Sequence, residues 1–239
     1  MACSPLASPP AADTTIPGEV ASQIVRERLS AVVVTRRNEL GSWVNQRFSM
    51  ENAPKDADGG SAAPITEDGY FLTADHVLAR ASGRNVFIIY GNGGRITTSK
   101  ARIVWRSYHD DLAILHIPVK TTYFYKWTPP HQWLSPGRGI IHGGMATGFK
   151  SSPGRLRSAL PPENSFTGNR SFKIDIPLQP GDSGGPVVDA FGNLVGINSA
   201  VEFLVPLETA IFIDSEGNRP NTKKIAGIIQ KDRNNNYRN

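Results

Sequence analysis

Short β-rich runs follow one another along most of this chain, and no long helical segment separates them. Each run is rich in β-branched or aromatic residues and ends in turn residues, with turns recurring about every 8–12 positions. The runs are "AVVVTRR" (31–37), "YFLTADHV" (70–77), "NVFIIY" (85–90), "RITTSKARIVWR" (95–106), "DLAILHI" (111–117), "GIIHGGMATGF" (139–149), "SFKIDI" (171–176), "GPVVD" (185–189), "NLVGINSA" (193–200) and "ETAIFID" (208–214). Because parallel strands need crossover helices, this pattern excludes a parallel α/β sheet and predicts an all-β sandwich or barrel.

Two short helices are expected at the ends of the folded part. Apolar residues recur at helical intervals within 19–30, and "TKKIAGIIQK" (222–231) has the same character. The predicted division is a flexible leader 1–18, rich in Pro, Ser and Ala, a folded unit 19–230 whose two β-rich halves meet at about 118–136, and a polar tail 231–239.

Composition excludes several function classes. The single cysteine, Cys3, rules out an intrachain disulfide. The net charge of +5 comes from scattered basic residues without a stripe of interleaved aromatics, so no nucleic-acid partner is predicted. No apolar run is long enough for a transmembrane helix. The chain has neither H-E-x-x-H nor paired cysteines, and "GNGG" (91–94) is typical of a hairpin turn, so we expect no metal and no cofactor.

The first residues leave two interpretations open. The start lacks the apolar segment of an intact signal peptide. Cys3 followed by Ser, Pro and Ala resembles a bacterial lipoprotein cut just before its lipid-bearing cysteine, which would give a lipid anchor and a location in the cell envelope or periplasm. The other interpretation is a native start with an incidental cysteine, which leaves the cytoplasm open.

The run "QPGDSGGPVV" (179–188) places Ser183 among glycines. It matches G-x-S-x-G, a pattern shared by unrelated hydrolases, and a plain glycine-rich turn is the alternative. In α/β-hydrolases the histidine follows the serine, but no histidine follows Ser183 here. If Ser183 is a nucleophile, its general base must therefore precede it in the chain.

A histidine and a carboxylate upstream suit that role. His76 lies at the end of the apolar run "YFLTADHV", where a rigid strand could aim it. Asp111 begins the strongly apolar "DLAIL", so its carboxylate would be partly buried and would need a donor such as a histidine N–H. Asp110 is expected to be a solvated turn residue. His109, His116, His131 and His142 are interpreted as ordinary structural histidines.

Three motifs in the order His, Asp, Ser then define a resemblance. "LTADHV", "DDLAIL" and "QPGDSGGPVV" resemble the catalytic signatures of the chymotrypsin-like (trypsin-fold) serine proteases, and "VGINSA" resembles their pocket-bordering strand. The absence of disulfides and the segment "IDIPLQPGDSGG" are more similar to the bacterial HtrA-like branch than to animal trypsins. The resemblance spans about residues 31–213.

The resemblance implies two perpendicular six-stranded antiparallel β-barrels with the site between them. It implies that Ser183 attacks the scissile carbonyl, that His76 is the general base and that Asp111 orients His76. The N–H groups of Gly181 and Ser183 would form the oxyanion hole. The expected function is a serine endopeptidase that acts on protein or peptide substrates. The alternatives are a protease-fold binding or scaffold protein and a self-processing protease with a single partner substrate.

The resemblance is incomplete in two respects. In trypsins the aspartate before the nucleophile pairs with an N-terminus freed by cleavage, but no activation site is evident here, so Asp182 is expected to be structural with another partner. Too few residues follow Ser183 in this sequence for the peptide-binding PDZ domain of HtrA-like proteases. We therefore expect an HtrA-like protease domain without a PDZ domain.

Residues that correspond to the family's specificity pocket indicate its preference. Pro177 and Leu178 stand where an acid would select Arg or Lys, and Asn198 stands where glutamate-specific relatives carry histidine. Val201 would narrow the pocket. The predicted pocket, formed by Pro177, Leu178, Asn198, Ser199, Ala200 and Val201, therefore favours small or apolar side chains at P1, the residue before the cleaved bond.

Overall fold

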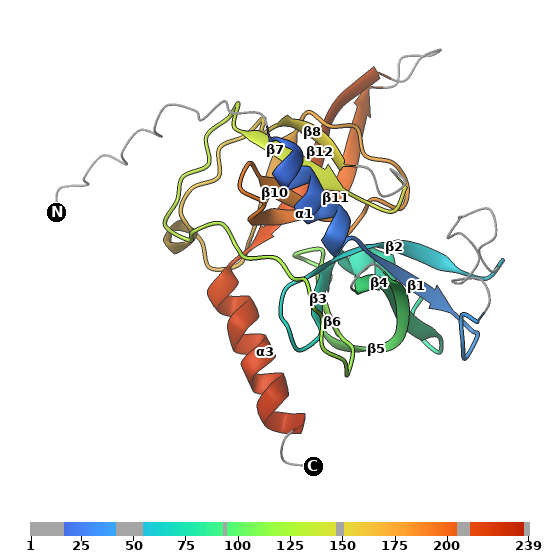
Figure 1. The fold of residues 1–239 in the computed structure, drawn as a ribbon. Helices are drawn as coiled ribbons and strands as arrows, with labels where there is room; N and C mark the ends of the chain where they lie inside the picture. Colours follow the sequence, from blue (N-terminus) through green and yellow to red (C-terminus); the bar gives the residue numbers. More distant parts are fainter. Residues whose placement is uncertain (1–16, 42–54, 93–94, 147–150, 205–210, 237–239) are drawn as a thin grey trace.

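The computed structural model describes residues 17–41, 55–92, 95–146, 151–204 and 211–236. The elements are mostly strands, and two helices flank them: α1 (Glu19–Arg28) and α3 (Thr222–Asn236). Figure 1 shows α1 lying across the strands and α3 extending toward the C-terminus, with its Ile225 and Ile229 buried in the core. The all-β class with two terminal helices is therefore confirmed.

The first six strands form a closed antiparallel barrel in the order β1-β2-β3-β6-β5-β4, here called the first barrel. Its strands are β1 (Ser30–Thr35), β2 (Asp58–Pro64), β3 (Tyr70–Thr73), β4 (Asn85–Asn92), β5 (Arg95–Ser107) and β6 (Leu112–His116). Closure leaves every described strand of the barrel paired on both sides.

The second half forms a six-stranded antiparallel sheet in the order β8-β7-β10-β11-β12-β9, here called the second sheet. Its strands are β7 (Gly139–Gly143), β8 (Ser151–Arg155), β9 (Asn169–Ile174), β10 (Pro186–Asp189), β11 (Leu194–Leu204) and β12 (Ile211–Pro220). An isolated bridge from Leu156 to Ile174 brings its two edges together, so this sheet is also barrel-like. The expected pair of six-stranded barrels is thereby confirmed.

Strand β1 shows why the apolar runs form these strands. All its residues are buried because both of its faces are covered. Val32 and Val34 point into the large core of the first barrel, whereas Ala31 and Val33 pack with Phe87 and neighbouring apolar residues on the other face. β-branched residues on a strand with two buried faces give a continuous apolar run rather than an alternating one.

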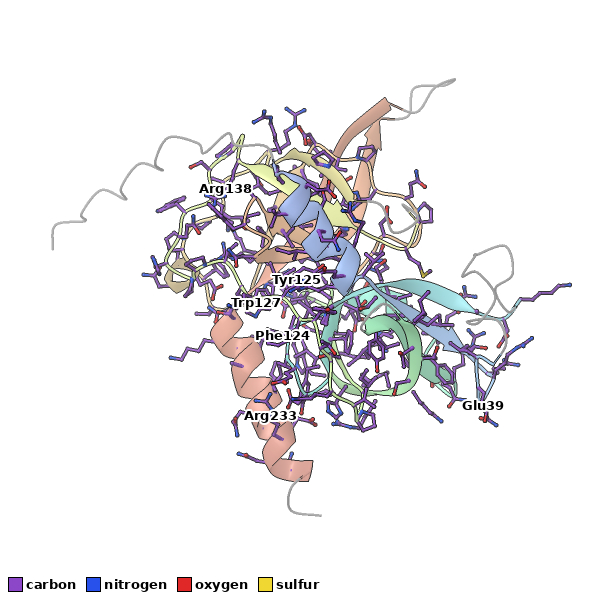
Figure 2. The ribbon with its side chains drawn as sticks, viewed as in Figure 1. Glu39, Phe124, Tyr125, Trp127, Arg138 and Arg233 are labelled. Atoms are coloured by element: carbon purple, nitrogen blue, oxygen red, sulfur yellow. The ribbon has the colours of Figure 1, made fainter. Side chains whose placement is uncertain are left out.

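The segment between β6 and β7 is fastened to both halves. Tyr125 donates its backbone N–H to Pro64 in β2, and Trp127 forms a bridge with Leu194 in β11. Figure 2 shows Tyr125 and Trp127 where this segment passes between the halves. The two halves thus share a connection with hydrogen bonds on each side.

Two strands were missed by the sequence analysis for one reason. The sequence of β2 is "DGGSAAP" and that of β8 is "SSPGR", compositions that are typical of loops. In β2 the small residues are required by close packing, because a Cβ on Gly60 would lie 3.0 Å from the carbonyl oxygen of Ser183. β8 is an edge strand, where Pro is tolerated.

Helix α3 extends beyond the end predicted for it. It continues to Asn236, so part of the predicted polar tail is helical and is anchored on the first barrel. Asp232 accepts hydrogen bonds from Tyr70 and from both terminal nitrogens of Arg102, at 2.7–2.9 Å. Arg233, labelled in Figure 2, forms a paired contact with Asp68. These contacts explain why a segment without apolar residues is ordered.

Glu163 holds the start of α3. Its carboxylate accepts from the backbone N–H and the hydroxyl of Thr222, at 2.9 and 2.6 Å. The same carboxylate lies 3.5 Å from the guanidinium of Arg219, which is completely buried. A buried cation needs a partner, and the first N–H groups of a helix need acceptors, so one side chain serves both.

We predict that Glu163→Ala lowers the free energy of unfolding by about 3 kcal/mol, because it leaves the Arg219 cation buried and unpaired. Urea denaturation followed by circular dichroism measures this change. Glu67→Ala is the matched control, since it removes an exposed carboxylate paired with Lys120, and we expect little effect. Equal effects of the two substitutions would contradict this role of Glu163.

Candidate active site

His76 and Asp111 are held together by three contacts. The Nδ1 atom of His76 lies 3.0 Å from both carboxylate oxygens of Asp111, and the backbone N–H of His76 donates to the same carboxylate at 3.0 Å. Because an ionised carboxylate only accepts, Nδ1 carries the proton and Nε2 keeps a free lone pair. The imidazole is about half exposed, so Nε2 can serve as a base toward a bound molecule.

The environment shifts the pKa values of this pair in opposite directions. The hydrogen bond that His76 donates to Asp111 raises the pKa of His76, and this outweighs the opposing effect of burial. Burial would raise the pKa of Asp111, but hydrogen bonds from His76 and Ser199 outweigh it and hold that pKa below its ordinary value. Each partner therefore favours the charged form of the other.

His76 does not lie on a strand, which corrects the sequence interpretation. It lies in the 3-10 helix η2 (Asp75–Leu78), directly after β3. The neighbouring Asp75 is buried, and its carboxylate binds the guanidinium of Arg106 from β5 at 2.7 and 3.0 Å. A two-point contact of this kind fixes orientation as well as position, so Arg106 holds the turn that carries His76.

The turn before β6 presents Asp111 in an unusual conformation. Asp111 has φ +45°, the only positive φ of a non-glycine residue in the described part of the chain. Asp110 braces this turn: its carboxylate accepts from Ser107 at 2.9 Å and from Lys224 of α3 at 3.0 Å. Asn169 donates to the Asp110 carbonyl at 2.9 Å. The expectation that Asp110 is a solvated turn residue was therefore wrong.

Ser183 lies in the loop before β10, between two glycines of positive φ. Gly181 has φ +107° and Gly184 has φ +82°, and a Cβ on Gly184 would lie 2.2 Å from the carbonyl oxygen of Ser61. Both glycines are therefore required by the shape of the loop. Among the described residues, the N–H groups of Gly181 and Ser183 donate no hydrogen bond, and both residues are partly exposed.

The hydroxyl of Ser183 donates to the carbonyl of Ser199 at 3.3 Å, and its hydrogen bonds within the described part of the chain do not include His76. Ser199 also donates its own hydroxyl to Asp111. The sequence motif predicts Ser199 only as part of the pocket wall. The structure gives it a second contact, which joins β11 to the carboxylate that orients His76.

Asp182 is completely buried behind Ser183. Its carboxylate accepts from the backbone N–H of Ala146 at 3.1 Å and from that of Gln179 at 3.0 Å, among other interactions. A Cβ on Gly144 would lie 2.1 Å from the same carboxylate. Backbone N–H groups thus serve as the alternative partner that the sequence analysis expected for Asp182.

The residues predicted to form the specificity pocket have different surroundings. Pro177 is exposed, whereas Leu178 packs in the core of the second sheet. Asn198 is completely buried, and its amide nitrogen lies 3.2 Å from Nδ1 of His142. The side chains of Ala200 and Val201 lie outside the described part. The assignment of these six residues to a specificity pocket stays a prediction.

Among the described residues, no other histidine forms a hydrogen bond with the Asp111 carboxylate or the Ser183 hydroxyl. His109 and His131 are exposed. His116 packs against Tyr70 with ring centroids 4.5 Å apart and the rings tilted by 46°. His142 is buried, which lowers its pKa. The described residues contain no group of three or more His, Cys, Asp or Glu side chains that could hold a metal ion, and no helix among them is long and apolar enough to cross a membrane.

A known sequence family matches the part of the chain that contains the candidate site. The sequence profile of the trypsin-like peptidase domain matches residues 60–197, a span that includes His76, Asp111 and Ser183. The chain belongs to the trypsin-like peptidase domain family. This family assignment agrees with the resemblance read from the three motifs.

Curated relatives of this trypsin-like chain are described as probable periplasmic serine endoproteases, DegP-like. The Pseudomonas fluorescens protein is 29% identical over 172 residues, covering 66% of this chain and 34% of the relative. The Rhizobium meliloti protein is 30% identical over 181 residues, covering 72% and 32%. The chain thus spans about a third of the length of these relatives.

Solved structures share the trypsin-like fold. The HtrA-type protease AlgW, solved with a tripeptide, matches with a TM-score of 0.61 and 22% identity, over 87% of this chain and 60% of AlgW. Deg5 matches with a TM-score of 0.58 and 17% identity, over 75% and 82%. These matches show that the fold is shared, and the DegP-like relatives support the HtrA-like branch within the family.

The contacts of His76 generate a prediction that needs no substrate. In an NMR titration of the imidazole, the midpoint should lie above the ordinary histidine value of about 6.5, because Asp111 stabilises the protonated ring. Asp111→Asn should lower the midpoint. Asp68→Asn, which removes a carboxylate paired with Arg233 away from this turn, should leave it unchanged. A midpoint that responds equally to both substitutions would contradict the assigned pairing.

Proposed function

We propose that this chain is a serine endopeptidase whose nucleophile is Ser183, with His76 as general base and Asp111 as the residue that orients it. The observation that carries the proposal is the contact of His76 Nδ1 with both oxygens of Asp111, which directs the basic Nε2 outward. Ser199 links the same carboxylate to the sheet that carries Ser183. Three residue types with these contacts suit nucleophilic acyl transfer.

In the proposed reaction, the Ser183 hydroxyl leaves the Ser199 carbonyl and turns to Nε2 of His76 when a substrate binds. Such hydrogen bonds are often loose before substrate arrives. His76 accepts the proton as Oγ attacks the scissile carbonyl, and it then protonates the leaving amine as the peptide C–N bond breaks. Water, deprotonated by His76, hydrolyses the acyl-enzyme and regenerates Ser183.

The negative charge that develops on the substrate oxygen needs donors. The N–H groups of Gly181 and Ser183, which donate to no acceptor in the described part of the chain, suit this role. Losing one such donor typically costs about 3–4 kcal/mol of transition-state stabilisation. The Asp182 carboxylate supports the loop through the N–H groups of Ala146 and Gln179. This arrangement needs no cleaved N-terminus, which supports an enzyme that is active as synthesised.

The proposed substrates are proteins or peptides with small or apolar P1 side chains. Neither Pro177 nor Leu178 offers a carboxylate to an incoming Arg or Lys, and Asn198 is not the histidine of glutamate-specific relatives. The relatives' description as periplasmic supports a location in the bacterial cell envelope. The lipid anchor predicted as one possibility at Cys3 falls outside the described residues and stays a prediction.

The direct test is labelling with a rhodamine-linked fluorophosphonate at neutral pH. The folded wild type should label, and Ser183→Ala should not, because only an activated serine reacts at a useful rate. Ser82→Ala is the matched control. It removes the hydroxyl of an exposed serine, and this variant should label as the wild type does. Absence of labelling in the folded wild type would favour the binding or scaffold protein instead.

The P1 proposal is tested with a peptide library whose cleavage sites are read by mass spectrometry. Cleavage should follow small or medium apolar residues such as Ala and Val. A strong preference for Arg, Lys or Glu would overturn the proposed pocket while leaving the catalytic residues in place.

A further inference from the structure

Ser61 is a buried serine that neither the sequence analysis nor the reaction uses. It lies in β2 of the first barrel and is completely buried. It is far from Ser183 along the chain, yet it contacts the loop around Ser183 directly. The surroundings of Ser61 therefore require a separate explanation.

Two hydrogen bonds join Ser61 to the loop. Its backbone N–H donates to the carbonyl of Ser183 at 2.8 Å, and its hydroxyl donates to the carbonyl of Gly181 at 2.7 Å. The two carbonyls flank Asp182. Both residues that would supply the oxyanion hole thus have their carbonyl groups anchored to one residue of the opposite barrel.

The remaining polar atoms of Ser61 fix its own position. The same hydroxyl accepts the backbone N–H of Met145 at 2.7 Å, and the Ser61 carbonyl accepts the hydroxyl of Thr73 at 2.7 Å. Met145 precedes Ala146, whose N–H binds the Asp182 carboxylate at 3.1 Å. The side chains of Ser61 and Asp182 thus connect the same two segments, namely residues 145–146 and the loop around Ser183 (179–184).

Gly181 needs the hydrogen bond that Ser61 donates to its carbonyl, because its own backbone is weakly constrained. Gly181 has φ +107°, and a Cβ there would approach nothing closer than 3.4 Å. No side chain of its own resists a change of φ or ψ, and such a change would turn its N–H away from the site. A hydrogen bond on its carbonyl opposes that rotation, because the carbonyl moves with the backbone.

We propose that Ser61 is a positioning residue for the oxyanion hole, holding the Gly181 and Ser183 N–H groups toward the site from the first barrel. This proposal rests on the function proposed above for Ser183. Ser61 touches neither substrate nor reacting atoms, so its effect passes through the loop. Small displacements of such donors are expected to have large effects on rate.

The test compares Ser61→Ala with Ser30→Ala. Ser30 is also a buried serine of the first barrel, and its hydroxyl donates to the Arg28 carbonyl at 3.1 Å, away from the loop. The readouts are the second-order rate of fluorophosphonate labelling across pH and hydrogen exchange of the peptide 179–184. A role confined to folding would affect both variants alike.

We expect Ser61→Ala to label about 10–100-fold more slowly than the wild type, with the pH midpoint unchanged because His76 and Asp111 are intact. Its 179–184 peptide should exchange faster than in the wild type. Ser30→Ala should label within about twofold of the wild type. Labelling of Ser61→Ala at the wild-type or Ser30→Ala rate would overturn the proposal.

Two further measurements keep the test decisive. If Ser61→Ala does not fold, Ser61→Cys retains side-chain volume with a weaker donor and should label more slowly than the wild type; labelling at the wild-type rate would overturn the proposal. If the wild type itself does not label, the proposed function fails. Hydrogen exchange of the peptide 179–184 then tests separately whether Ser61 holds the loop. Faster exchange in the Ser61 variant would support its hold on the loop, and equal exchange would overturn it.

Discussion

The carboxylate of Asp111 accepts hydrogen bonds from both halves of the molecule. It receives the backbone and side-chain N–H groups of His76 from the first barrel and the hydroxyl of Ser199 from the second sheet. Its turn is braced by Asp110, which in turn binds Lys224 of the C-terminal helix. The site therefore depends on one charged group whose position is set by several elements, and its burial is offset by these hydrogen bonds.

The loop that carries Ser183 (179–184) is also held by hydrogen bonds to several elements. Its carbonyls are held by Ser61, and its buried Asp182 carboxylate is held by backbone N–H groups. The loop can thus reach its functional shape from contacts internal to the folded chain, without a new terminus.

Much of the fold could be predicted from the sequence because apolar runs, turn residues and three ordered motifs agree with one another. The failures have physical causes. At Gly60 in β2 a Cβ would crowd the Val77 side chain and the Ser183 carbonyl, and packing of this kind is invisible to propensity. Arg106 and Ser61 lie far along the chain from the residues that they support, so only tertiary structure reveals them. Asp110 appeared to be a solvated turn residue because its partner, Lys224, belongs to a distant helix.

In the proposed mechanism, His76 activates Ser183 while its own orientation is fixed by Asp111. The most direct test is the pH dependence of fluorophosphonate labelling, measured on the same protein as the NMR titration of His76. The labelling rate should rise as His76 loses its proton and level off, with a midpoint equal to that of the imidazole and above the ordinary histidine value of about 6.5. A rate that stays undiminished at pH 4, or a midpoint unrelated to the His76 titration, would contradict the account.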